Sequence, residues 1–233
     1  MPPSVSGDFD KNVFINCPFD PEYTSLLRPL LFTILYVGMI PKIGLERSDS
    51  GETRINKICE MIRDSRYSIH DLSRLQSRRR NEFYRMNMPF ELGIEYGCRQ
   101  FGPDHFRNKR CLILEKSRHD YAKALSDLAG VDIKSHQDKP EDLILAMRDW
   151  FFETVGLRSI DSRTVIWYKF TDFTSSFYNT RKNQGYSDED IEDMSVPEYM
   201  HFIQEWLKDQ RVTAQGATVR VHAQTPIIST TET

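Results

Sequence analysis

Cysteine is scarce in this chain, and its spacing excludes two common uses of the residue. The four cysteines among 233 residues form no CxxC pair and have no histidine at ligand spacing; they are Cys17, Cys59, Cys98 and Cys111. This spacing argues against a disulfide scaffold and against a structural zinc site. Each cysteine lies in or beside an apolar segment, which favours buried free thiols in a reducing compartment. We therefore predict a cytoplasmic protein that binds no metal ion.

Long apolar runs and a targeting signal are also missing. The longest apolar stretch, residues 26–40, is interrupted by Arg28 and Thr33 and is too short to span a bilayer. Residues 1–7 have neither the basic nor the apolar region of a signal peptide. A net charge of −3 and a pI near 6.1 disfavour a nucleic-acid-binding surface. These features predict a soluble protein without a membrane or nucleic-acid partner.

The chain lacks the glycine-rich motifs that bind phosphate. Neither GxGxxG nor a Walker sequence occurs among its 11 glycines, which argues against a Rossmann oxidoreductase and a P-loop NTPase. A nucleophile elbow with a Ser/His/Asp order is also absent. Candidate chemistry therefore has to be sought in other residues.

Residues 10–156 alternate between short apolar strands and helices. The predicted strands cover 13–15, 39–45, 67–72 and 110–114, and the predicted helices cover 22–37, 53–65, 89–100 and a segment beginning at 140. Wholly apolar strands are typical of a parallel sheet that is covered on both faces. This alternation predicts right-handed crossovers and a doubly wound parallel sheet of the α/β class.

The composition changes after Gly156. Residues 160–180 are rich in aromatic side chains, and a capping box from Ser195 to Glu198 starts a further helix. We predict a flexible N-terminus (1–9), the α/β domain (10–156), a C-terminal helical appendage (157–211) and a tail (212–233). The appendage either packs on the sheet domain or offers an interface. Its apolar side chains, Trp206 among them, indicate a surface for self-association or sensing.

Two carboxylates are the candidate catalytic groups. Asp71 ends the third predicted strand, and Glu91 lies in the first turn of a helix that opens with Pro89. The carboxyl ends of parallel strands and the helix starts that follow them line the ligand crevice of open α/β sheets. Two carboxylates in such a crevice suit cleavage of a glycosidic bond, because positive charge develops on the sugar ring.

Each carboxylate also has a structural explanation. Glu91 near a helix start can return a hydrogen bond to the N-cap residue and interact favourably with the helix dipole. Asp71 can hold its loop through side-chain hydrogen bonds. Glu95 lies one turn beyond Glu91 on the same helix face, so it is a rival for any catalytic role.

Five further residues are candidates for substrate binding: Phe14, Asn16, Phe19, Arg47 and Ser73. Phe14 and Phe19, in and after the first strand, either wall a pocket or belong to the core. Asn16 is polar in an apolar setting, and it either bonds the ligand or caps a turn. Arg47 follows the second strand, and Ser73 follows the third.

The loop before the Glu91 helix is rich in arginine. It contains Arg74, Arg78, Arg79, Arg80 and Arg85. Guanidinium groups match phosphate oxygens, so the cluster is a candidate clamp for a diphosphate. A solvated basic loop is the alternative explanation.

Several of these segments resemble known enzyme families. The segment 11–16 resembles the first-strand box of TIR domains, and the segment 65–73 is similar to their third-strand region. The order of Asp71-Leu72 and Glu91-Leu92-Gly93 resembles the nucleoside 2-deoxyribosyltransferase relatives. Both groups have flavodoxin-like folds in which a glutamate acts on a ribosyl carbon. The resemblance covers roughly residues 10–155, the size of one domain.

The resemblance implies cleavage of an N-glycosidic bond. In TIR enzymes the substrate is NAD, which is hydrolysed or converted to cyclic ADP-ribose, often in bacterial antiphage defence; the transferase relatives remove or exchange a base. Glu91 would stabilise the ribosyl cation, and Asp71 would orient a ribose hydroxyl or protonate a base. NAD would be the substrate, with no further cofactor. Homo-oligomerisation on activation and a partner defence protein are also implied, and a non-catalytic TIR-type assembly module is the remaining alternative.

Overall fold

Five parallel strands form one sheet at the centre of the molecule. The computed structural model describes residues 7–46, 48–75, 86–118, 121–128 and 130–223, with side chains described as far as residue 212. The strand order is β2-β1-β3-β4-β5. The strands are β1 (Asn12–Asn16), β2 (Ile40–Ile43), β3 (Tyr67–Asp71), β4 (Arg110–Glu115) and β5 (Lys134–Ser135). The predicted doubly wound, flavodoxin-like sheet is therefore confirmed, and its register pairs Val13 of β1 with Pro41 of β2 and Tyr67 of β3.

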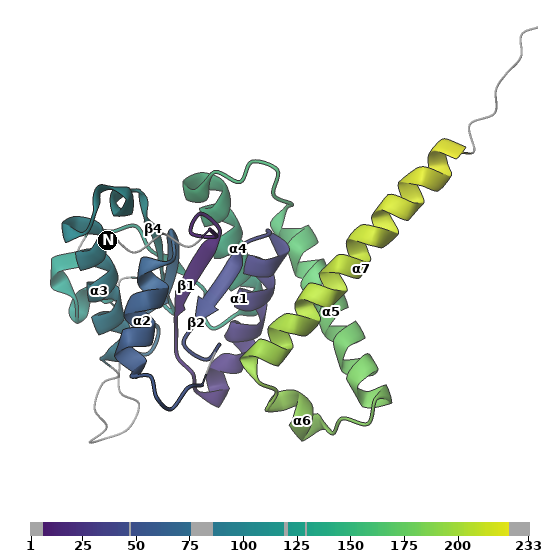
Figure 1. Cartoon of the computed structure of the whole chain (residues 1–233), viewed down its shortest axis with the longest axis horizontal. Coiled ribbons are helices and arrows are strands. Elements are labelled where there is room, and N and C mark those ends of the chain that lie inside the picture. Colours follow the sequence, from purple (N-terminus) through teal and green to yellow (C-terminus); the bar gives the residue numbers. More distant parts are fainter. Residues whose placement is uncertain (1–6, 47, 76–85, 119–120, 129, 224–233) are drawn as a thin grey trace, which may run out of the picture.

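Helices cover both faces of the sheet (Figure 1). The four long ones of the α/β domain are α1 (Thr24–Tyr36), α2 (Arg54–Arg63), α3 (Asn87–Phe101) and α4 (Pro140–Trp150). Short 3₁₀ turns cover Pro21–Tyr23, Asp104–Asn108, Tyr121–Lys123 and Ser126–Leu128, and a π-helical turn, Phe151–Val155, continues α4. Val13 and Ile15 of β1 belong to the core on the α1 and α4 side, whereas Phe14 packs against α2. Burial on both faces explains why β1 is apolar.

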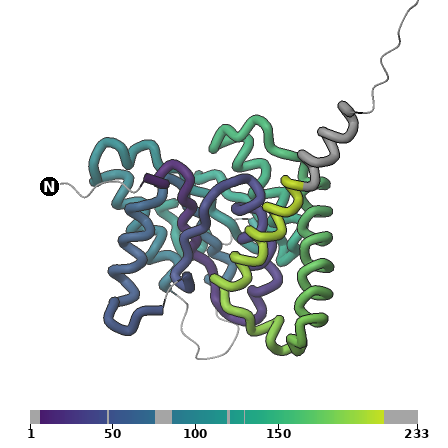
Figure 2. The backbone as a smooth tube through the Cα atoms, turned by 45° about the vertical axis from the view of Figure 1, so that its right-hand side comes forward, coloured from purple at the N-terminus to yellow at the C-terminus, as the bar shows by residue number. Residues whose placement is uncertain are grey.

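The C-terminal helices pack on the outer side of α1. They are α5 (Arg163–Asn183), α6 (Asp188–Glu192) and α7 (Val196–Ala223), and α5 and α7 lie against α1 in both views (Figures 1 and 2). The ring of Phe32 in α1 lies 5.4 Å from Phe170 and 5.6 Å from Phe173. Covered by the sheet on one side and by this appendage on the other, α1 is apolar around its circumference.

Two details of the appendage differ from the sequence prediction. Trp206, predicted to present an exposed surface, is partly buried and packs against the common core, with its ring 6.0 Å from Phe32, and self-association through it stays a prediction. The helix α7 continues to Ala223, so the first part of the predicted tail is helical.

A serine and two glycines mark the ends of helices in this structure. Ser195 Oγ accepts a hydrogen bond from the Glu198 N–H at 3.4 Å, which confirms the predicted N-cap of α7. Gly38, just after α1, has a φ of 81°, a left-handed conformation that glycine adopts without strain. Gly156 ends the π-helical turn in the same way, with a φ of 87°.

Candidate functional site

The sheet order creates a crevice between the carboxyl ends of β1 and β3. The chain leaves β1 through α1 toward β2, while β3 pairs with the other edge of β1. Flavodoxin-like sheets bind their ligands at this switch point. A cavity of about 360 Å³ lies here. Its lining consists of the segment 16–21 after β1, Arg54 at the start of α2, and Asn87, Met88 and Glu91 of α3.

Glu91 lies one turn into α3 and lines this cavity. The helix begins at Asn87 after Met86, and no side chain caps its first turn. The capping role that the sequence allowed for Glu91 is therefore not seen. Glu91 is 6 % exposed, and burial raises the pKa of its carboxyl to about 7 against the opposing charge of Arg54. Near neutral pH this carboxyl is therefore populated in both protonation states.

Arg54 and Phe19 add a cation and an aromatic ring to the same cavity. The Arg54 guanidinium lies over the Phe19 ring, 5.5 Å from its centre. This contact is favourable because the ring face carries negative charge density. Arg54 is the first residue of α2, where the positive end of the helix dipole disfavours a basic side chain. Its basic side chain at a helix start was the available sequence signal, and the sequence interpretation did not single it out.

Asn16 connects the end of β1 to the first turn of α3. Its Nδ2 donates a hydrogen bond to the Met88 carbonyl at 2.8 Å and lies 2.9 Å from His70 Nδ1. Burial, and to a smaller extent the charge of Lys109, lowers the pKa of His70 to about 3, so a neutral ring accepts the second bond. Asn16 thus holds in place the helix turn that precedes Glu91.

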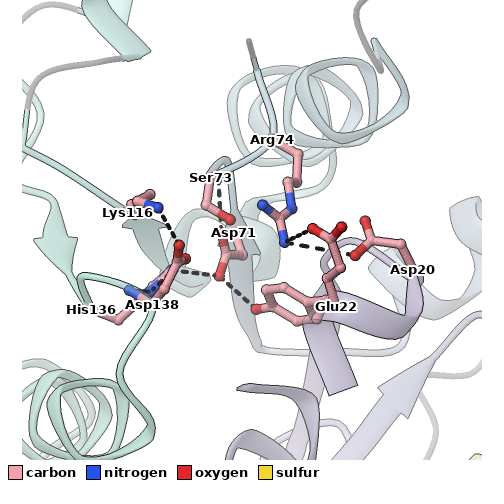
Figure 3. Close-up of polar contacts among 9 residues, drawn as sticks. Asp20, Glu22, Asp71, Ser73, Arg74, Lys116, His136 and Asp138 are labelled. Atoms are coloured by element: carbon pink, nitrogen blue, oxygen red, sulfur yellow. Dashed lines mark hydrogen bonds and ion pairs between the residues drawn. The ribbon is translucent and has the colours of Figure 1, made fainter. Parts of the chain in front are cut away.

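Asp71 is the centre of a buried polar network that joins three segments of the chain. Its Oδ2 accepts a hydrogen bond from the Tyr23 hydroxyl at 2.5 Å and lies 3.1 Å from His136 Nε2. Its Oδ1 accepts a hydrogen bond from the Ser73 N–H at 2.8 Å. The Asp138 N–H donates to His136 Nδ1 at 3.0 Å, so a neutral imidazole carries its proton on Nε2, toward Asp71. Figure 3 shows Asp71 between Ser73 and His136.

The bond from the Ser73 N–H bears out the alternative that Asp71 holds its loop, and the contacts with Tyr23 and His136 extend this structural role. Orientation of a ribose hydroxyl by Asp71 stays a prediction. Burial alone raises the pKa of Asp71, but the contacts with His136, Ser73 and Tyr23 outweigh it, and the pKa falls below its usual value. A general acid needs a raised pKa, so protonation of a base by Asp71 is not supported. Glu91 lines the cavity and Asp71 does not, so the predicted pair of Glu91 and Asp71 does not face one crevice. The second carboxylate of the lining is Asp20, which lies 3.7 Å from Arg74 Nη2.

The remaining predicted binding residues have different environments. Asn16 and Phe19 line the cavity, and their role in substrate binding stays a prediction. Phe14 is fully buried against α2, so it belongs to the core and not to a pocket wall. Ser73 contributes its backbone N–H to Asp71. Outside the described residues lie Arg47, Arg78, Arg79, Arg80 and Arg85.

Arg74, the first arginine of the predicted phosphate clamp, is paired with carboxylates. Its Nη2 lies 3.7 Å from Asp20 Oδ1 and 3.6 Å from Glu22 Oε2 (Figure 3). The pairing links the segment after β3 to the segment after β1. Arg74 therefore supports the shape of the site, and its charge is partly neutralised.

Glu95, the rival of Glu91, is the counter-charge of a buried lysine. Glu95 Oε1 lies 3.4 Å from Lys109 Nζ, and both side chains are buried. Lys109 also donates to the carbonyls of Ile62, at 2.7 Å, and Ser65. Burial raises the pKa of Glu95 to about 7 as well, so its partner, and not its pKa, distinguishes it from Glu91. We assign Glu95 a structural role.

No protein-family model, curated protein or solved structure matches this chain. Across the described residues, no three metal-ligating side chains gather into a cluster. Of the described helices, none is both long and apolar enough to cross a membrane. The cavity around Glu91 is therefore the basis for a functional proposal.

Proposed function

We propose that this protein is an N-glycosidase that cleaves a ribosyl–base bond, with NAD as the favoured substrate. The observation that carries the proposal is the buried Glu91 carboxyl at the switch point of the sheet, beside Arg54 and Phe19. The resemblance of the segments before and around Glu91 to TIR domains and to nucleoside 2-deoxyribosyltransferases supports the same type of bond.

Glu91 would stabilise the positive charge that develops on the ribose. When the bond from the ribosyl carbon to the nicotinamide nitrogen breaks, its electron pair goes to nitrogen, and nicotinamide leaves as a neutral molecule without a general acid. The ribosyl group becomes cationic. The ionised Glu91 stabilises this cation electrostatically or by transient covalent attachment, and water then completes the hydrolysis. Burial strengthens the interaction because less water screens it.

Arg54 and Phe19 suit the remaining parts of the substrate. A guanidinium fork matches the oxygens of a diphosphate, and an aromatic ring stacks on a nicotinamide. A second, open cavity of about 610 Å³ adjoins the first, since both are lined by Phe19, Asp20 and Pro21. The second cavity offers room for the part of a dinucleotide that the first does not hold.

Removal of a base from a nucleoside or nucleotide is the second candidate. A purine or pyrimidine is a poor leaving group unless it is protonated, and a carboxyl with a pKa of about 7 is an effective donor at neutral pH. On this alternative, Glu91 in its protonated state acts as the general acid.

Product analysis separates these candidates. We would incubate the purified chain with NAD and with a panel of nucleosides and nucleotides, and separate nicotinamide and free bases by chromatography. Nicotinamide release that Glu91→Gln abolishes supports the first proposal, and base release from nucleosides alone supports the second. No release from any substrate contradicts both and favours the non-catalytic assembly module. Homo-oligomerisation, a partner defence protein and a role in antiphage defence stay predictions.

A further inference from the structure

A larger cavity lies at the other end of α1, where the appendage meets the α/β domain. Its volume is about 800 Å³. The end of α1, the loop 156–161 and residues of α5 and α7 line it, and we call it the appendage groove. It shares no lining residue with the cavity around Glu91. The helix α1 (Thr24–Tyr36) lies between the two cavities and is roughly 18 Å long at 1.5 Å per residue.

Three cationic side chains line the appendage groove, each from a different segment. They are Arg158 of the loop, Lys169 of α5 and Arg211 of α7. Within the described part of the chain, none of the three forms an ion pair with a carboxylate. Lys169 Nζ contacts Gln210 Oε1 at 3.3 Å, and the Arg158 guanidinium lies 4.8 Å from the centre of the Phe152 ring. Their charges are therefore available to an anionic ligand.

The groove also has an apolar and aromatic wall. Tyr36, Trp206, Leu157 and Leu207 line it. Asp161 is the one carboxylate of the lining, and its Oδ2 accepts a hydrogen bond from the Tyr36 hydroxyl at 2.5 Å. The lining thus combines a positive charge excess with flat apolar surface, which suits a ligand that has an anionic end and a planar ring.

We propose that the appendage groove binds a nucleotide with two or more phosphates. The phosphates would lie between Arg158, Lys169 and Arg211, because guanidinium forks match phosphate oxygens. The base would lie against Tyr36 and beside Trp206, over whose ring Lys169 Nζ lies at 5.9 Å from the centre. The cavity falls within the range of about 300–1,000 Å³ that small-molecule sites have. Such a ligand bridges the loop after α4 and the helix α7, so it holds the appendage against the α/β domain.

Calorimetric titration of the full chain with ATP, GTP and UTP tests this site. We expect at least one triphosphate to bind, and Arg158→Gln/Arg211→Gln to weaken its affinity about tenfold or more, because charge-assisted hydrogen bonds are lost. Lys208→Gln removes an exposed cation of α7 outside the groove, and it should leave the affinity unchanged. Glu91→Gln should also leave it unchanged, which separates this site from the proposed catalytic one. Melting curves show that each variant is folded.

Two partial ligands test the nucleotide assignment. Inorganic tripolyphosphate lacks the base, and adenosine lacks the phosphates, so each should bind at least about tenfold more weakly than ATP. Tripolyphosphate binding as tight as that of ATP overturns the assignment, because the groove is then a general polyanion site. An unchanged affinity in the double arginine variant, or no binding of any triphosphate to the unmodified chain, overturns it as well.

Discussion

Glu91 and Glu95 lie one turn apart on α3, and burial raises the pKa of each carboxyl to about 7. Glu95 has the buried ammonium of Lys109 at 3.4 Å. Glu91 opens onto a cavity instead, and Arg54 acts on it as a nearby charge. A buried carboxyl that lines a cavity can interact with a ligand there. Strongly shifted pKa values of groups in clefts are typical of catalytic residues.

Glu91→Gln tests the proposed chemistry. The substitution keeps the size of the side chain and removes its negative charge, so we expect nicotinamide release to fall about a hundred- to a thousandfold. In the unmodified protein the rate should rise as the pH increases through about 7, because the ionised carboxylate is the active form. Steady-state assays between pH 5 and pH 9 measure both effects. Unimpaired release by Glu91→Gln would exclude the catalytic role of this residue.

The same substitution should change how stability depends on pH. The native state keeps a proton on Glu91 up to a pKa of about 7, whereas the unfolded chain releases it near 4.5. This carboxyl therefore favours the native state fully only at low pH, and that contribution is lost as the pH rises through 7. We expect Glu91→Gln to melt at a higher temperature than the unmodified protein at pH 8, and at the same temperature at pH 4. A lower melting temperature at pH 8 would indicate that the ionised Glu91 stabilises the fold.

Glu95→Gln should show the opposite pattern, with a loss of stability and little loss of turnover. Above pH 7, where Glu95 is ionised, the substitution leaves Lys109 buried without its counter-charge, which costs about 3–5 kcal/mol of unfolding free energy. Replacing both partners, by Glu95→Leu and Lys109→Met, should cost less than the single change. Urea denaturation measures the free energies, and nicotinamide release per folded molecule measures turnover. A loss of turnover as large as that of Glu91→Gln would restore Glu95 as the catalytic candidate.

At the scale of elements, β1 carries a buried asparagine at each end. Asn16 Nδ2 donates to the Met88 carbonyl of α3, and Asn12 Nδ2 donates to the Asp64 carbonyl after α2, both at 2.8 Å. Both side chains are buried, and each joins the strand to a helix on the α2 and α3 face of the sheet. Only the Asn16 contact lies at the end of the strand that is near Glu91. Comparing substitutions of Asn16 and Asn12 therefore distinguishes an effect on stability alone from an effect on the position of α3.

Comparing Asn16→Ala with Asn12→Ala tests whether the Asn16 contact positions α3. Each change removes a side-chain hydrogen bond to a backbone carbonyl, so each should lower the free energy of unfolding by about 0.5–1.5 kcal/mol. Asn16→Ala should also reduce turnover per folded molecule, because the turn before Glu91 loses its support. Equal turnover in the two variants would show that the Asn16 contact does not position the catalytic helix.

The strands and helices of the α/β domain were predictable because their signals are local. The apolar run of β1 and the one-face pattern of α2 depend on neighbouring residues, and both elements formed within two residues of the predicted bounds. The loop-holding bond from the Ser73 N–H to Asp71 is local and was one of the two sequence alternatives. The other partners of Asp71, Tyr23 and His136, were not predictable, because they lie far away in the sequence. A strand-end carboxylate looks the same whether it faces a ligand or a buried imidazole.

At the scale of the whole molecule, the predicted boundary at residue 156 does not separate two cores. The side of α1 that faces away from the sheet packs against α5 and α7, in one continuous hydrophobic cluster. A chain ending at that boundary would expose the outer face of α1 to water, and a large exposed apolar patch favours aggregation. The α/β domain and the appendage are therefore expected to unfold together.

Phe32 lies where the α/β domain and the appendage meet, so replacing it tests whether the two unfold together. The ring is fully buried and contacts α5 and α7, so Phe32→Ala should lower the free energy of unfolding by about 3–5 kcal/mol. Phe101→Ala is the matched control, because Phe101 is 89 % exposed and its loss should change stability by about 0.5 kcal/mol or less. Urea unfolding followed by tryptophan fluorescence and by circular dichroism should give one coincident transition for all three proteins. Two separate transitions, with Phe32→Ala affecting only one of them, would show that the appendage folds independently of the sheet.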